Sequence, residues 1–86
     1  MKSTHTPEYA KALAALVSAR KERQVPQVEL AKKLGKPQSF VSKYESRERR
    51  LDIAEFFVIC RALRANPVDV LIRSGLLSDD DAAFKS

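Results

Sequence analysis

Apolar residues recur at helical spacing along most of the chain, and short breaks separate the helical segments. The first stripe predicts a helix over about residues 7–23, because Pro7 suits a first helical position and Thr6 can cap it. Its apolar members are Tyr9, Leu13, Leu16 and Val17. Arg20 lies in the middle of this stripe, so its charge is expected to be partly buried and to need an acidic partner.

Two short helices follow, joined by a link of about three residues. Pro26 precedes the segment 27–34, whose apolar side consists of Leu30, Ala31 and Leu34. Gly35 ends this helix, because glycine readily takes the left-handed conformation found at helix exits. Pro37 then begins the next helix, over about residues 38–46. The length and chemistry of the link are typical of a helix-turn-helix.

Two further helices are predicted, at about residues 52–63 and 67–74. The first is the most apolar segment of the chain, so we expect it to be central in the fold. It begins with Asp52 and Glu55 at the spacing of a capping box. The second begins after a break at Pro67 and directs three apolar residues inward, Val68, Leu71 and Ile72.

The length of 86 residues fits one small all-α domain of five helices. We expect residues 1–6 to be a flexible N-terminus, residues 7–74 to be the domain, and residues 75–86 to be a short tail. The core of such a domain is thin, so a stable fold needs tight helical packing or a partner subunit. No apolar run is long enough for a membrane span and the N-terminus lacks a secretory signal, which predicts a cytoplasmic protein.

Catalytic and metal chemistry find no support in the residue pattern. The one histidine, His5, lies alone near the N-terminus, and the one cysteine, Cys60, lies among phenylalanine and isoleucine at helical spacing, where it suits the core. No Ser/His/Asp set, pair of catalytic carboxylates, glycine-rich phosphate loop or cluster of metal ligands is evident. We therefore predict no enzyme activity, no metal and no cofactor.

The net charge of +5 is concentrated in one segment. Residues 32–50 contain seven basic and two acidic residues, a difference of +5, and the rest of the chain is balanced, nine against nine. A compact basic segment on a neutral body indicates a polyanion as partner. Charge alone is equally compatible with a solvated, lysine-rich face.

The helix predicted over residues 38–46 divides into two faces at about 100° per residue. The side that packs against the body holds Phe40, Val41 and Tyr44. The other side presents Gln38, Ser39, Ser42 and Lys43, whose polar groups suit base edges in the major groove of DNA. An ordinary amphipathic surface helix would divide in the same way. The basic residues that follow at once favour duplex DNA; they are Arg47, Arg49 and Arg50.

Five short motifs follow one another between residues 27 and 52. They are Gln27, Glu29-Leu30-Ala31, Leu34-Gly35, Val41-Ser42-Lys43-Tyr44-Glu45 and Arg50-Leu51-Asp52. With these motifs, about residues 9–73 resemble the Cro/C1-type helix-turn-helix family, also called the XRE family. The resemblance implies a compact, five-helix, lambda-repressor-like DNA-binding domain, in which Ala31 packs where two helices cross closely and Gly35 makes the turn.

The resemblance also implies roles for single residues. The positions that contact bases match Gln38, Ser39, Ser42 and Lys43. Those that contact the DNA backbone match Gln27, Ser46, Arg47 and Arg50, and we add Lys36 and Arg49 from the basic segment to this phosphate-binding set. Arg20 and Glu45 match a partly buried ion pair between the first helix and the end of the third. This pair would supply the acidic partner that Arg20 needs.

The chain departs from the family pattern at several helix ends. Family members often have glycine after the first helix, in the loop after the third, and after the fourth, where this chain has Gln24, Arg47 and Arg64. The geometry of these exits therefore stays open at this point. Pro26 replaces the usual Ser, Thr or Asn cap of the second helix, so a contact worth about 1 kcal/mol is absent.

The predicted function is that of a sequence-specific regulator of transcription, a repressor that binds a two-fold-symmetric operator as a homodimer. One recognition helix contacts only a few base pairs, and pairing doubles the footprint. The predicted dimer seam is the fifth helix with the tail, where the surplus apolar residues are Val70, Leu76 and Leu77. The alternative is an antitoxin or another protein-interaction module on the same fold, with a toxin or co-regulator as partner.

Overall fold

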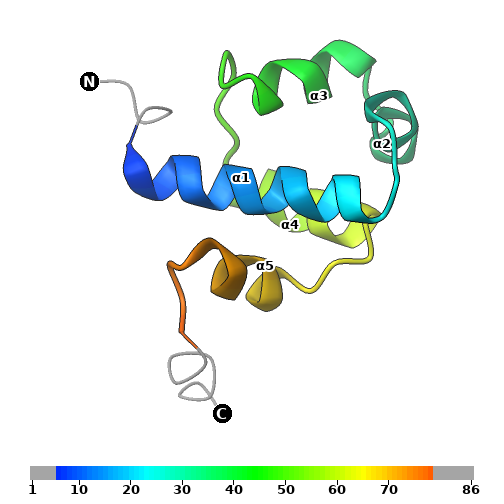
Figure 1. Cartoon of the computed structure of the whole chain (residues 1–86). Coiled ribbons are helices and arrows are strands. Elements are labelled where there is room, and N and C mark those ends of the chain that lie inside the picture. Colours follow the sequence, from blue (N-terminus) through cyan, green and yellow to red (C-terminus); the bar gives the residue numbers. More distant parts are fainter. Residues whose placement is uncertain (1–5, 79–86) are drawn as a thin grey trace.

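The computed structural model describes residues 6–78, which form five helices and no strand (Figure 1). The helices are α1 (Pro7–Glu22), α2 (Gln27–Leu34), α3 (Gln38–Glu45), α4 (Ile53–Ala62) and α5 (Pro67–Ser74). The predicted all-α fold is confirmed, and each helix begins and ends within one residue of its predicted bounds. Residues 1–5 and 79–86, to which most of the predicted N-terminus and tail belong, lie outside the described residues.

Side-chain caps fix the starts of three helices. At α1 the hydroxyl of Thr6 accepts a hydrogen bond of 3.2 Å from the amide of Tyr9. At α4 the capping box is complete, because the amide of Glu55 donates to Asp52 at 2.7 Å and the amide of Asp52 donates to Glu55 at 2.9 Å. At α5 the cap is the side chain of Asn66. The helices α2 and α3 begin after prolines and have no side-chain cap.

The five helices enclose one small hydrophobic core. In Figure 1, α1 crosses the centre with α3 on one side and α5 on the other, and α4 lies behind α1. The α2 helix is seen almost end-on while α3 lies across the view, as expected for a helix-turn-helix. The largest fully buried side chains are those of Tyr44, Leu16, Leu30, Ile59, Val41 and Cys60. Burial raises the pKa of the Cys60 thiol to about 11, so this cysteine is a core residue with little thiolate at neutral pH.

The prediction of a central α4 is wrong for one side of that helix. Ile59 and Cys60 are buried, but Ile53 is 75% exposed, Phe57 45% and Val58 49%. The sequence could not show this. A helix that is apolar all round is buried all round only if other elements cover each of its sides, and the pattern does not say which sides are covered. The prediction for Val70 also needs correction: its side chain, expected at a dimer seam, is 3% exposed and belongs to the core.

The three helix exits that the family resemblance left open have the same backbone geometry. Gln24, Arg47 and Arg64 all have positive φ, at 57°, 68° and 57°, in the left-handed region. A Cβ atom is strained there by roughly 1–2 kcal/mol. The exits therefore keep the conformation that a glycine would take, although this chain has larger residues in all three places.

Replacing Arg64 by glycine is expected to raise the free energy of unfolding by roughly 0.5–1 kcal/mol. The gain comes from relief of the strain at φ 57°, less the larger conformational entropy that glycine loses on folding. Urea unfolding measures the change. The control is Arg64→Ala, which removes the same charge and keeps a Cβ atom, so an equal gain in both variants would show that charge, and not the backbone, is responsible.

Candidate nucleic-acid interface

The α3 helix presents a polar side to solvent and packs its apolar side against the body. Val41 is fully buried and Tyr44 is 1% exposed, while Phe40 packs edge-on against the Tyr44 ring at 5.6 Å between ring centres. The four residues that the sequence nominated for base contacts share the outer side: Gln38, Ser39 and Lys43 are exposed and Ser42 is half-buried. The structure thus brings all four together on one short helix.

A buried ion pair holds the end of α3 to α1. The Nε atom of Arg20 donates to one carboxylate oxygen of Glu45 at 2.7 Å, and its Nη2 atom donates to the other at 2.9 Å. The two side chains are 10% and 8% exposed. The Nη1 atom of Arg20 donates to the carbonyl of Val25 at 2.8 Å, and the hydrogen bond to Glu45 raises the pKa of Arg20. The guanidinium therefore stays charged and has partners in three directions.

Gln27 connects the start of α2 to the same carboxylate. Its Nε2 atom donates to Glu45 at 2.8 Å, so this one carboxylate links α1, α2 and α3. A primary amide has two N–H groups, and the second group of Gln27 is not used by this bond. Gln27 is the first residue of α2, whose N-terminus has no side-chain cap. The side-chain amide of Gln27 and the backbone amides of the first turn therefore lie together, where a phosphate can accept hydrogen bonds from both.

The loop after α3 is held by a contact that sequence reasoning missed. The guanidinium of Arg49 lies over the ring of Phe40, 4.7 Å from its centre, and makes two hydrogen bonds to the carboxylate of Glu55, at 3.0 and 2.8 Å. These bonds lower the pKa of Glu55. The six-residue separation of Arg49 and Glu55 spans a loop and a helix start, where no helical spacing rule applies, so the sequence contained no signal for the pair.

The remaining phosphate candidates surround α3. Arg47 and Arg50 are exposed in the loop that follows this helix, and Ser46 is exposed at its end. The hydroxyl of Ser46 donates to the carbonyl of Lys43 at 3.1 Å. Lys36, in the turn before α3, is exposed and its Nζ atom lies 5.6 Å from the centre of the Phe40 ring. Positive charge thus flanks the polar side of α3 at both ends.

These features together define a class of protein. Two short helices joined through Gly35, an outward polar face on the second helix, and cations before and after that helix are the parts of a helix-turn-helix DNA-binding domain. Within residues 6–78 no helix is long and apolar enough to span a membrane, and no group of three potential ligands could hold a metal ion.

The comparisons with known proteins show the family. The helix-turn-helix family HTH_3 matches residues 16–70, and the chain belongs to this Cro/C1-type, or XRE, family. A solved structure, the XRE-family like protein from Pseudomonas syringae pv. tomato, is similar with 44% sequence identity and a TM-score of 0.73, over 79% of this chain and 85% of that one. No curated protein matches. The protein is thus a DNA-binding transcriptional regulator, of a family that is generally not enzymatic.

Proposed function

We propose that the protein is a sequence-specific repressor that inserts α3 into the major groove of a two-fold-symmetric operator. The observation that carries this proposal is the outer side of α3, which exposes amide, hydroxyl and ammonium groups and no carboxylate. The residues that contact base edges are Gln38, Ser39, Ser42 and Lys43. Glutamine pairs well with adenine and lysine with guanine, so each good contact discriminates by about 1–3 kcal/mol.

Phosphate contacts set the register of α3 in the groove. The residues proposed for them are Gln27, Lys36, Ser46, Arg47 and Arg50. Arg49 was predicted in the same set, but its guanidinium is bound by Glu55 and stacks on Phe40, so we assign it to support of the loop. A protein bound across a promoter blocks access to it without any further domain, which is why a repressor is proposed. This function places the protein in the cytoplasm.

The proposal includes a homodimer. The two half-sites of a symmetric operator lie about 34 Å apart, one turn of DNA. The molecule measures 37 × 32 × 20 Å, so two copies side by side match the length of such an operator. Pairing also raises affinity, because a single domain makes few phosphate contacts and its binding weakens steeply with salt.

A salt series tests the phosphate surface. Fluorescence anisotropy on a duplex of fixed sequence is expected to show log K falling linearly with log salt concentration, and Arg47→Ala should make the slope shallower by roughly 0.9 for each protomer bound. The matched control is Lys11→Ala, which removes the same charge from the side of α1 that faces Ser74. Equal slopes for Arg47→Ala and the unmodified protein would remove Arg47 from the interface.

A further inference from the structure

The loop after α3 places one carboxylate among positive charges. Residues 46–50 contain three arginines and a single acidic residue, Glu48. The backbone turns sharply at Arg47, where φ is 68°. The amides of Glu48 and Arg49 then both donate to the carbonyl of Lys43, at 2.9 and 3.1 Å. The backbone of Glu48 is therefore fixed against the last turn of α3, inside the segment proposed to contact phosphates.

The side chain of Glu48 contacts a group that is itself proposed to bind phosphate. Its Oε2 atom accepts a hydrogen bond of 2.9 Å from the hydroxyl of Ser46, whose oxygen also lies 3.1 Å from the carbonyl of Lys43. A hydroxyl has one proton and donates to one acceptor at a time. Glu48 and Ser46 are both exposed, so a phosphate can reach the same hydroxyl from solvent. A phosphate that accepts from Ser46 must therefore compete with the carboxylate for this proton.

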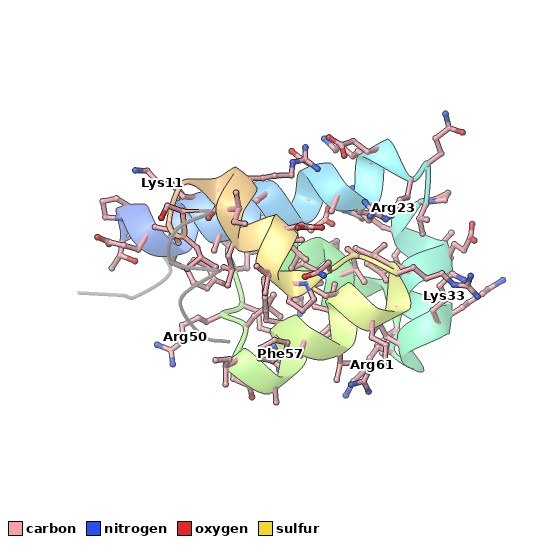
Figure 2. All side chains as sticks on the ribbon, turned by 90° about the horizontal axis from the view of Figure 1, so that it is seen from below. Lys11, Arg23, Lys33, Arg50, Phe57 and Arg61 are labelled. Carbon is pink, nitrogen blue, oxygen red and sulfur yellow. The ribbon has the colours of Figure 1, made fainter. Side chains whose placement is uncertain are left out.

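The arginines of the loop have different surroundings. The guanidinium of Arg49 makes two hydrogen bonds to the carboxylate of Glu55, at 3.0 and 2.8 Å, so its charge is matched there. Figure 2 shows Arg50 extending outward from the segment that leads to α4, and Arg47 is exposed. In the chain, the two arginines proposed for phosphates therefore lie on either side of a carboxylate that is held by a neutral hydroxyl.

We infer that Glu48 limits the affinity of this protein for DNA, because its carboxylate occupies the Ser46 hydroxyl until a phosphate displaces it. The inference rests on the proposed function and adds a residue that opposes binding to those that support it. A phosphate oxygen bound to Ser46 takes the place of Oε2, and two negative charges about 4 Å apart repel one another even in water. The side chain of Glu48 therefore turns away into solvent when the loop binds, and the hydroxyl is released to the phosphate.

This role concerns the part of binding that carries no sequence information. Phosphate contacts act on every duplex alike and supply nearly all of non-specific binding. A chain of net charge +5 is attracted to DNA of any sequence, and a carboxylate in the phosphate-binding loop weakens this attraction where it acts. The outer side of α3 is unaffected. Glu48 thus keeps the protein weakly bound to unrelated DNA, so that a larger share of the binding free energy depends on base contacts.

The test is Glu48→Gln in the full chain, with binding to a duplex of arbitrary fixed sequence followed by fluorescence anisotropy. Glutamine keeps the size of the side chain and removes its charge. We expect the affinity at low salt to rise about 3- to 10-fold for each protomer bound, and the gain to shrink as salt screens the charge. The control is Asp69→Asn, the same change at an exposed position of α5, across α1 from α3 in Figure 1. Its effect should stay below about 2-fold.

The same substitution in a Ser46→Ala background tests the hydroxyl itself. Without this hydroxyl the carboxylate has lost the donor that holds it at the phosphate site, so Glu48→Gln is expected to add less than about 2-fold there. A simple effect of net charge would give the same gain in both backgrounds. Ser46 and Glu48 are exposed, so circular dichroism and urea unfolding should show that all variants fold with nearly unchanged stability.

Three results would overturn the inference. They are an unchanged affinity of Glu48→Gln, an equal gain with and without Ser46, and an equal gain from Asp69→Asn. A gain that depends on Ser46, in a protein that selects no DNA sequence, would support the inference and overturn the proposed function. A chain that binds no duplex even at low salt would overturn both.

Discussion

Glu45→Ala is expected to lower the free energy of unfolding by about 3–5 kcal/mol, the largest change of any single substitution considered for this chain. The variant leaves the charged side chain of Arg20, which is 10% exposed, without its carboxylate. It also removes the acceptor of Gln27, so α1, α2 and α3 lose the group that links them. Small domains are stable by roughly 5–15 kcal/mol, and urea unfolding will therefore show a large shift of the midpoint.

A double variant distinguishes the cost of the unpaired charge on Arg20 from the loss of the carboxylate that links the three helices. In Arg20→Met/Glu45→Leu both charges are replaced by apolar side chains, so no buried charge is left unpaired. We expect this protein to recover most of the stability, because exchanging a buried ion pair for apolar groups is often neutral. Glu48→Ala is the control for a carboxylate at the surface, with an expected change within about 0.5 kcal/mol. A loss below about 1 kcal/mol for Glu45→Ala would contradict the structural role of the pair.

Gln38→Ala/Lys43→Ala is expected to weaken binding to the selected operator by at least about 100-fold, with little change in stability. Both side chains are exposed on the outer side of α3, so their removal should alter the free energy of unfolding by less than about 0.5 kcal/mol. Each base contact supplies about 1–3 kcal/mol of discrimination, and two are lost in every half-site. Fluorescence anisotropy with the operator and with an unrelated duplex measures the two affinities.

The comparison of the two duplexes distinguishes base contacts from charge. Binding to the unrelated duplex should weaken much less, because phosphate contacts carry no sequence information. Lys11→Ala again serves as the control for the loss of one positive charge, and it should preserve the preference for the operator. Equal weakening on both duplexes would mean that α3 contacts phosphates rather than bases.

The helix-turn-helix could be predicted from the sequence because its signals are local. Pro26, Gly35 and Pro37 fix the ends of α2 and α3 through backbone restrictions that act on single residues. The two faces of α3 follow from helical periodicity, and the burial of Val41 and Tyr44 agrees with it. The partner of Arg20 was supplied by family resemblance, since residues 25 positions apart have no spacing rule.

The features that sequence reasoning missed depend on which elements meet. The α4 helix is apolar on nearly every side, and only the packing shows that Ile53 and Phe57 have no cover. In α5 the three consecutive residues 70–72 are apolar, and so is Val68. The pattern therefore did not distinguish the buried Val70 from the half-buried Leu71. The pairing of Arg49 with Glu55 depends on how the loop after α3 turns, and no local sequence pattern indicates that turn.

The central claim is that this protein recognises duplex DNA sequence through α3, and selection from a random duplex library tests it most directly. The unmodified protein and Gln38→Ala/Lys43→Ala would be carried through the same rounds and the bound DNA sequenced. The account predicts a two-fold-symmetric site that the unmodified protein enriches and the variant does not. A site without symmetry would keep the regulator and contradict the homodimer. No enrichment even at low salt would contradict the central claim and favour a protein-interaction module with a toxin or co-regulator as its partner.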